Sequence, residues 1–174
     1  MNWMKKVAVA LVCLLPLGLQ AAKVDTLQVK SPSMNKSIEV VVVSPDMAAT
    51  EACPVIYLLH GYGGNARTWV GIKPDLPKIA DEKGIFFVCP DGKNTWYWDS
   101  PLNADVRYET FISDELVKYV DSHYKTVADR KGRAITGLSM GGHGAMWNGL
   151  RHSDVFSAAG STSGGVDILS LIHI

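Results

Sequence analysis

The residue of this chain best placed for nucleophilic chemistry is a serine flanked by glycines. Ser139 is the centre of a Gly-x-Ser-x-Gly pattern that lies between the β-prone run 134–136 and the helix-compatible run 145–150. This context predicts a sharp strand-to-helix turn, the nucleophile elbow, which lifts the serine Oγ clear of a sheet. The flanking glycines allow neighbouring backbone to approach without a Cβ clash. We therefore interpret Ser139 as the nucleophile of a serine hydrolase rather than as a serine that only caps a helix.

Such a serine needs a base to take its proton and hydrogen-bond donors to stabilise the oxyanion that forms. The elbow itself makes the backbone N–H of Met140 one of these donors. The second should come from the glycine-rich loop 60–65, which follows the apolar run 54–59 directly. Its glycines allow the backbone to turn its amides inward. Taken alone, the loop could also be a tight turn without a chemical role.

The elements that must position these groups alternate between strands and helices. The β-rich runs 24–29 and 37–43, separated by a turn-rich linker, predict an antiparallel hairpin. A helix is expected over 75–83 with Gly84 as its end, and a longer one over 108–124. In the longer helix one face should carry Phe111, Ile112, Leu116, Tyr119, Val120 and His123. Parallel strands are expected over 54–59, 85–89, 133–137 and 155–160.

Several short motifs follow one another in an order that is similar to a known family. The series resembles the esterase D-like α/β-hydrolases, which include S-formylglutathione hydrolases, feruloyl and other carbohydrate esterases, tributyrin-type esterases and mycolyltransferases. The resemblance covers about residues 24–165 and implies a three-layer α/β-hydrolase-type fold with a mostly parallel sheet. The motifs are the His-Gly-Tyr-Gly-Gly segment 60–64, Pro-Asp-Gly at 90–92, Trp-Tyr at 96–97, Tyr-Glu-Thr at 108–110 and the elbow at 137–142.

The resemblance also implies roles for individual residues. Ser139 would attack the ester and form an acyl-enzyme, and the backbone amides of Met140 and Tyr62 would bind the oxyanion. The residues expected beside the substrate are His60, Gly61, Trp96 and Tyr97. The aromatic stretch 96–99 could equally be a cluster that packs a loop onto the sheet.

The chain departs from the family at the catalytic acid and histidine. The triad order is serine, acid, histidine, but only 35 residues follow Ser139. Asp154 should lie at the wrong end of the last strand, and Asp167 comes one strand early. His173 is in the right order, but it belongs to an abrupt apolar tail unlike the family. We therefore expect a partial hydrolase domain over 23–168 without its last strands, acid and base, a doubtful non-native tail over 169–174, and a nearly inactive chain.

Composition and the N-terminal residues indicate which partners and which location to expect. The 174 residues contain 17 basic and 17 acidic side chains, so nucleic acid is not expected as a partner. Lys5 and Lys6 precede an apolar run over 7–19, which is shorter than the ~20 residues of a membrane span. Residues 1–22 therefore predict a secretory signal peptide. We expect a secreted or periplasmic protein without stable membrane insertion after cleavage.

Two cysteines remain after the predicted cleavage site. Cys53 precedes one strand and Cys89 ends its expected parallel neighbour. The offset between them is roughly 20 Å at ~3.3 Å per residue, whereas a disulfide needs Cα atoms within about 7 Å. Two free, largely buried thiols are predicted.

The residues leave the exact reaction open. An exported serine esterase that acts on small-molecule or carbohydrate esters is the leading hypothesis. Acyl transfer to a sugar or lipid hydroxyl is a second, and a non-catalytic binding domain on the hydrolase scaffold is a third. No cluster has metal-ligand spacing and no loop resembles a nucleotide site, so neither a metal nor a cofactor is expected.

Overall fold

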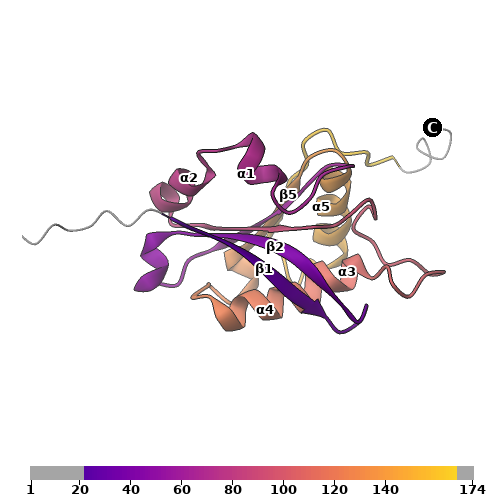
Figure 1. Ribbon diagram of the computed structural model, residues 1–174, viewed down its shortest axis with the longest axis horizontal. Coiled ribbons are helices and arrows are strands. Elements are labelled where there is room, and N and C mark those ends of the chain that lie inside the picture. The colour runs from indigo at the N-terminus through magenta and orange to yellow at the C-terminus, as the bar shows by residue number, and fades with distance from the viewer. Residues whose placement is uncertain (1–21, 168–174) are drawn as a thin grey trace, which may run out of the picture.

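The computed structural model describes residues 22–167, and these form a mixed sheet with helices on both faces (Figure 1). The strand order is β1-β2-β4-β3-β5-β6. The first two strands form an antiparallel hairpin, β2 pairs with β4 in antiparallel fashion, and the remaining pairs are parallel. This confirms the predicted fold class. The strands are β1 Lys23–Ser31, β2 Lys36–Ser44, β3 Val55–Leu59, β4 Phe86–Pro90, β5 Arg133–Gly137 and β6 Ala158–Ala159.

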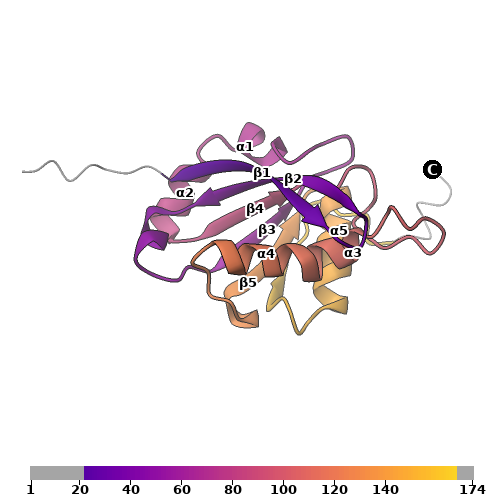
Figure 2. The same ribbon diagram turned by 60° about the horizontal axis from the view of Figure 1, so that its bottom comes forward.

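The three layers follow from the alternation of side chains along the buried strands. In β2, Val40 and Val42 belong to one buried cluster, whereas Val41 and Val43 belong to another on the opposite face. Successive side chains of a strand point to opposite faces, so each face needs its own cover. The helices α1 Thr68–Ile72 and α2 Leu76–Lys83 lie on one side, and α4 Leu116–His123 lies on the other (Figures 1 and 2).

The two predicted helices are present, but the second has an irregular turn. Gly84 ends α2 in the left-handed conformation, as expected. The segment predicted as one helix over 108–124 consists of α3 Tyr108–Thr110, the π-helical turn η2 Phe111–Glu115, and α4. A π turn holds more residues than an α turn and therefore rotates the residues after it. Val117 is consequently buried, and His123, predicted on the buried face, is exposed.

The last strand is shorter than the sequence predicts. Of the run predicted over 155–160, only Ala158 and Ala159 form the strand β6 beside β5, and residues 155 and 156 instead continue the turn that follows the helix α5 Met140–Arg151. Phe156 turns inward, where its ring meets that of Tyr57 edge-on at a centroid distance of 5.6 Å. Within residues 22–167, β6 is the last strand in the sheet order. The strand predicted over 155–160 is therefore reduced to two alanines.

Some of the remaining predictions are confirmed, and others concern residues outside the described part of the chain. Cys53 and Cys89 are free and buried, as expected. Burial, with Glu51 nearby, raises the pKa of the Cys53 thiol, and burial alone raises the pKa of Cys89. No helix in the described part of the chain is long and apolar enough to cross a membrane. Nearly all of the predicted signal peptide and the whole 169–174 tail lie outside it. The 3-10 helices are η1 Asp46–Ala49 and η3 Arg130–Gly132.

Candidate active site

The turn between β5 and α5 has the geometry of a nucleophile elbow. Ser139 has φ 53° and ψ −116° and is the residue immediately before α5. A positive φ is strained for a residue with a Cβ atom. Small neighbours make the turn possible, because a Cβ on Gly137 would lie 2.3 Å from the Gly141 carbonyl oxygen. A Cβ on Gly141 would lie 2.1 Å from the carbonyl oxygen of Leu59. The glycines are therefore required by the contact between the elbow and β3.

Two backbone amides near the serine are available as donors. The loop after β3 packs against the elbow, since a Cβ on Gly61 would lie 3.5 Å from Ser139 Cβ. Neither the N–H of Met140 nor that of Tyr62 is donated to an acceptor within residues 22–167. Met140 lies in the first turn of α5, where amides have no intrahelical partner. Both residues predicted to form an oxyanion hole therefore have free amides beside the serine.

The His60 side chain is buried beneath this loop and does not lie on its surface. Its imidazole is 1% exposed. One ring nitrogen, Nδ1, lies 2.7 Å from the Gly61 carbonyl oxygen and so donates to it, while Nε2 accepts the backbone N–H of Gly92 at 3.0 Å. The ring thus ties the loop after β3 to the loop after β4. The side chain is thus buried and bound to the two loops, and its predicted contact with substrate stays a prediction.

Asp91 lies beneath the same imidazole and is also buried. Its Oδ1 is 3.5 Å from His60 Nε2, and its Oδ2 is 2.6 Å from the ammonium of Lys93. Burial of the carboxyl raises its pKa, but the hydrogen bonds and charge of Lys93 outweigh this and hold the pKa well below its usual range. Asp91 is therefore a fixed negative charge between the two loops.

The two aromatic residues at 96–97 differ in burial and in what they contact. Both residues have positive φ, 59° for Trp96 and 61° for Tyr97. Tyr97 is fully buried, and its hydroxyl donates to the His60 carbonyl oxygen at 3.1 Å. It therefore packs the loop onto the sheet, which is the second of the two roles weighed for this stretch. Trp96 is partly exposed and meets His143 edge-on at 5.3 Å. Only Trp96 of the two has surface available to a ligand.

No base is in contact with the serine in the described residues. Ser139 is exposed, and its Oγ has no hydrogen-bond partner within 22–167. His143, one helical turn later, is buried, with Nδ1 2.8 Å from the Gly165 carbonyl oxygen and Nε2 without a partner. Asp154 lies in the turn ahead of β6, and His173 lies outside the described residues. The same part of the chain contains no group of His, Cys, Asp or Glu side chains able to hold a metal ion.

Glu109 has a role that sequence reasoning missed. Its buried carboxylate accepts hydrogen bonds from Trp147 at 2.7 Å, Arg151 at 2.7 Å and His152 at 2.9 Å, all in or just after the elbow helix. Burial raises the pKa of this carboxyl, but the three donors outweigh it and lower the pKa. The signal was the Tyr-Glu-Thr motif at 108–110, which sequence reasoning noted only as part of the resemblance. Glu109 anchors the far end of α5 and so helps to hold the elbow.

Comparison with known proteins agrees with this site. The chain matches the Esterase family model over residues 31–171. Esterase Rv1288 of Mycobacterium tuberculosis is 30% identical over 144 residues, which are 79% of this chain and 31% of that protein. The diacylglycerol acyltransferase/mycolyltransferase Ag85A of Mycobacterium leprae is 32% identical over 158 residues, 83% of this chain and 44% of that protein.

A solved structure supports the same grouping. A ferulic acid esterase superposes with a TM-score of 0.68 at 32% identity, covering 80% of this chain and 61% of that one. The chain thus spans between about a third and three fifths of the length of these relatives. From the family match over most of its residues, the shared fold and the elbow with its glycine loop, the chain belongs to the esterase D-like family of α/β-hydrolases.

Proposed function

We propose that this chain carries the nucleophile and oxyanion hole of an exported serine esterase. Ser139 attacks the carbonyl carbon of a carboxylic ester, and the alcohol leaves as the acyl group becomes bound to Oγ. Water then attacks the acyl-enzyme and releases the acid. The amides of Met140 and Tyr62 stabilise the negative oxygen in both steps, because they are preorganised donors that need no rearrangement.

The observation that supports this proposal is the strained serine beside two free amides. A non-glycine residue is held at positive φ only where the surrounding structure compensates for its cost of about 1–3 kcal/mol. Here the glycine contacts with Leu59 supply that constraint. Ser163 offers a comparison within the chain, because it also has a positive φ, 52°, but does not precede a helix.

Covalent labelling tests the assignment. The chain is incubated with a fluorophosphonate or a p-nitrophenyl ester, and the adduct is mapped by peptide mass spectrometry. We expect slow formation of an adduct on Ser139, because an oxyanion hole without its triad retains catalysis of about 10³-fold or more over water. Ser139→Ala should abolish the adduct and Ser163→Ala should leave it unchanged. An adduct that persists in Ser139→Ala, or none after long incubation, would contradict the proposal.

The catalytic acid and histidine are not assigned to any described residue. Without them the serine keeps its proton, and turnover falls by several orders of magnitude. We therefore expect the chain to acylate slowly and to turn over very little. If the chain hydrolyses p-nitrophenyl acetate at rates usual for an esterase, a catalytic base must lie within it. The expectation of a nearly inactive chain would then be wrong.

Acyl transfer is a second candidate, and the similarity to a mycolyltransferase favours it. The acyl-enzyme would then be attacked by a sugar or lipid hydroxyl instead of water. Product analysis in the presence and absence of a sugar acceptor separates the two reactions. An acylated sugar that appears in preference to the free acid would support transfer.

Export rests on the pattern of residues 1–22 and stays part of the proposal. The mature protein would be secreted or periplasmic, where extracellular small-molecule or carbohydrate esters are its substrates. N-terminal sequencing of the protein recovered from the producing cells tests this. A start near Lys23 is expected, and an intact residue 1 in the soluble fraction would contradict export.

A further inference from the structure

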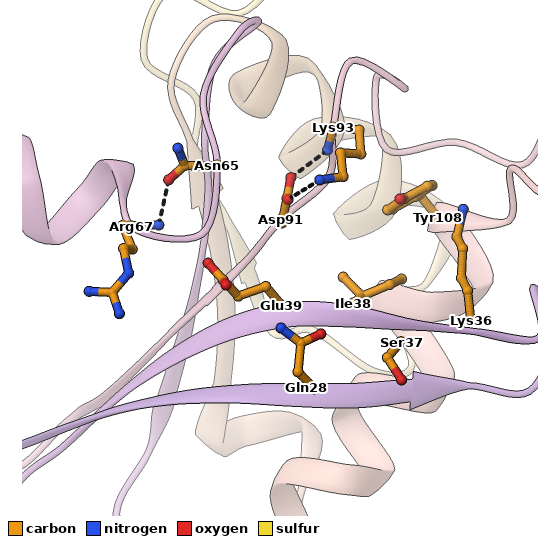
Figure 3. A pocket seen from close by; sticks show the side chains of 10 residues that line it. All are labelled: Gln28, Lys36, Ser37, Ile38, Glu39, Asn65, Arg67, Asp91, Lys93 and Tyr108. Atoms are coloured by element: carbon orange, nitrogen blue, oxygen red, sulfur yellow. Dashed lines mark hydrogen bonds and ion pairs between the residues drawn. The ribbon is translucent and has the colours of Figure 1, made fainter.

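The first part of the loop after β4, residues 91–97, contains several residues with a Cβ atom at positive φ. Lys93, Trp96 and Tyr97 have φ 50°, 59° and 61°. Such residues cost about 1–3 kcal/mol each and persist only where the surrounding structure fixes them. Asp91 fixes the start of the segment, because its carboxylate accepts the Lys93 backbone N–H at 2.9 Å and the Lys93 ammonium at 2.6 Å (Figure 3). At the end of the segment lies the fully buried side chain of Tyr97.

The Tyr97 ring fills a space between two glycines that belong to different elements. A Cβ on Gly92, in the same loop, would overlap the ring at Cε1, and a Cβ on Gly144 in α5 would lie 2.5 Å from Cδ2. The ring also meets the His60 ring edge-on at a centroid distance of 5.7 Å. The ring therefore packs the loop after β4 against the helix that begins directly after the nucleophile.

Two hydrogen bonds of Tyr97 join this loop to the other parts of the site. Its hydroxyl donates to the His60 carbonyl oxygen at 3.1 Å. Its own carbonyl oxygen accepts the side-chain NH₂ group of Asn148, a fully buried residue of α5, at 3.0 Å. Burial raises the pKa of the Tyr97 hydroxyl well above its usual range, which keeps the hydroxyl protonated and able to donate. Because buried polar groups are costly to leave unpaired, these bonds fix the side chain in one position.

The carbonyl that Tyr97 holds is close along the chain to the Tyr62 amide. The His60 carbonyl and the Tyr62 N–H belong to consecutive peptide planes, and only the two torsions of Gly61 separate them. A glycine restricts its own torsions least, so contacts to the two planes must set the direction of the amide. The Gly61 carbonyl oxygen is held by His60 Nδ1 at 2.7 Å and by the Gly64 N–H at 3.0 Å. The other plane is held by the Tyr97 hydroxyl.

We propose that Tyr97 is a positioning residue of the oxyanion hole, which holds the Tyr62 N–H in the direction of the oxygen that becomes negative at Ser139. This inference rests on the proposed esterase function and adds to it a residue that touches neither the substrate nor the serine. The two donors of the hole come from separate elements, the loop after β3 and α5. Both must lie about 2.7–3.1 Å from the same oxygen. Tyr97 is bonded to both elements and so sets the spacing between them.

The kinetics of covalent labelling test the proposal on the 174-residue chain. Tyr97→Phe removes the hydroxyl and keeps the ring. We expect the limiting rate of Ser139 labelling by a fluorophosphonate to fall about tenfold, less than the about 10²–10³-fold effect of losing one oxyanion donor outright. The probe concentration that gives half of this rate should not change, because Tyr97 does not touch the probe.

Tyr57→Phe is the matched control. Tyr57 is also fully buried, but its hydroxyl has no hydrogen-bond partner within residues 22–167. The same oxygen atom is therefore lost from a buried tyrosine without an effect on the loop, and the labelling rate should stay that of the wild type. Circular dichroism of each variant at the assay temperature shows that a slower rate is not lost folding.

A second measurement does not depend on reactivity. The residual dipolar coupling of the Tyr62 N–H, measured by NMR, reports the direction of that bond. It should change in Tyr97→Phe and stay unchanged in Tyr57→Phe, while the couplings of β3 are the same in all three proteins.

The outcomes that overturn this inference differ from those that overturn the esterase assignment. Labelling of Tyr97→Phe at the wild-type rate, an equal loss of rate in Tyr57→Phe, or an unchanged coupling of the Tyr62 N–H would refute the positioning role, even with Ser139 labelled. A wild-type chain that never labels at Ser139 would instead refute the esterase function. The dipolar coupling would then still decide whether Tyr97 sets the direction of the amide.

Discussion

The nucleophile elbow and a polar pocket lie at the same edge of the sheet but are built by opposite means. At the elbow, backbone contacts set the geometry, and the glycines matter because they have no side chain. In the pocket of about 460 Å³ between the N-terminal hairpin and the loops after β3 and β4, side chains from five separate segments form the lining, and the backbone holds them apart (Figure 3). The elbow therefore tolerates almost no added atom, whereas the pocket should tolerate substitutions without loss of stability.

The largest effect should come from adding one methyl group at the elbow. In Gly141→Ala the new Cβ would lie 2.1 Å from the Leu59 carbonyl oxygen, and this backbone group cannot move away. Overpacking of this kind costs about 1–3 kcal/mol or more. Urea denaturation measures it. Gly71→Ala, in a helix with nothing within 4 Å of the new Cβ, is the control and should stabilise by about 0.5 kcal/mol. Equal effects would contradict the steric account.

A second prediction concerns Asp91, which lies between the two regions. Its pKa is depressed in the folded state, so its contribution to stability is complete above its unfolded pKa of about 3.9 and is lost as pH falls further. The loss is at most ~1.4 kcal/mol per pH unit. The free energy of unfolding, measured from pH 7 down to pH 3, should fall more steeply for the wild type than for Asp91→Asn below pH 4. Parallel curves would show that Asp91 carries no such linkage.

The positive φ of Ser139 gives a third, smaller effect. Ser139→Gly should be more stable than Ser139→Ala by about 1 kcal/mol, because glycine adopts positive φ without the Cβ penalty. The order is the reverse of that expected in a helix or strand, where glycine is about 0.5–1 kcal/mol worse than alanine. Thermal or urea unfolding of the two variants decides it. Alanine as the more stable residue would mean that the elbow is not strained.

The smallest effect on stability is expected in the pocket. Glu39→Gln and Asn65→Ala should change the free energy of unfolding by no more than about 0.5 kcal/mol, because the Glu39 side chain has no partner within residues 22–167 and the Asn65 side chain has one exposed hydrogen bond. For Asn65 the hydrogen bond to the Arg67 amide is exposed and contributes little. A loss above about 1.5 kcal/mol would show that the pocket is structural and would remove the contrast with the elbow.

Much of the fold was predictable from local patterns. The hairpin, the apolar strands β3, β4 and β5, and the end of α2 at Gly84 follow from runs of a few residues and are confirmed. The π turn at 111–115 was not predictable, because no residue type there marks it and its effect is visible only in which side chains are buried. The shortening of β6 depends on Phe156 packing on Tyr57, a contact between segments about a hundred residues apart.

The candidate site was predictable where its residues are neighbours in the sequence. Ser139 and Met140 are adjacent in the chain, so one motif places both. His60 and Tyr97 were interpreted as substrate contacts, but the structure buries both side chains under the loop. Burial depends on neighbours from other elements, and residue type alone does not reveal it. Glu109 was overlooked as a functional anchor because its three donors come from the other end of the elbow helix.

By itself, the sequence determined that a serine would stand on a glycine-lined turn between a strand and a helix. That information is local, because the spacing of glycines within one turn decides which backbone conformations are free of clashes. Only the tertiary structure decided that the Leu59 carbonyl would contact Gly141, that His60 would be buried beneath the glycine-rich loop 60–65, and that a polar pocket would form beside it. Those features depend on the register of the sheet, which brings distant segments together.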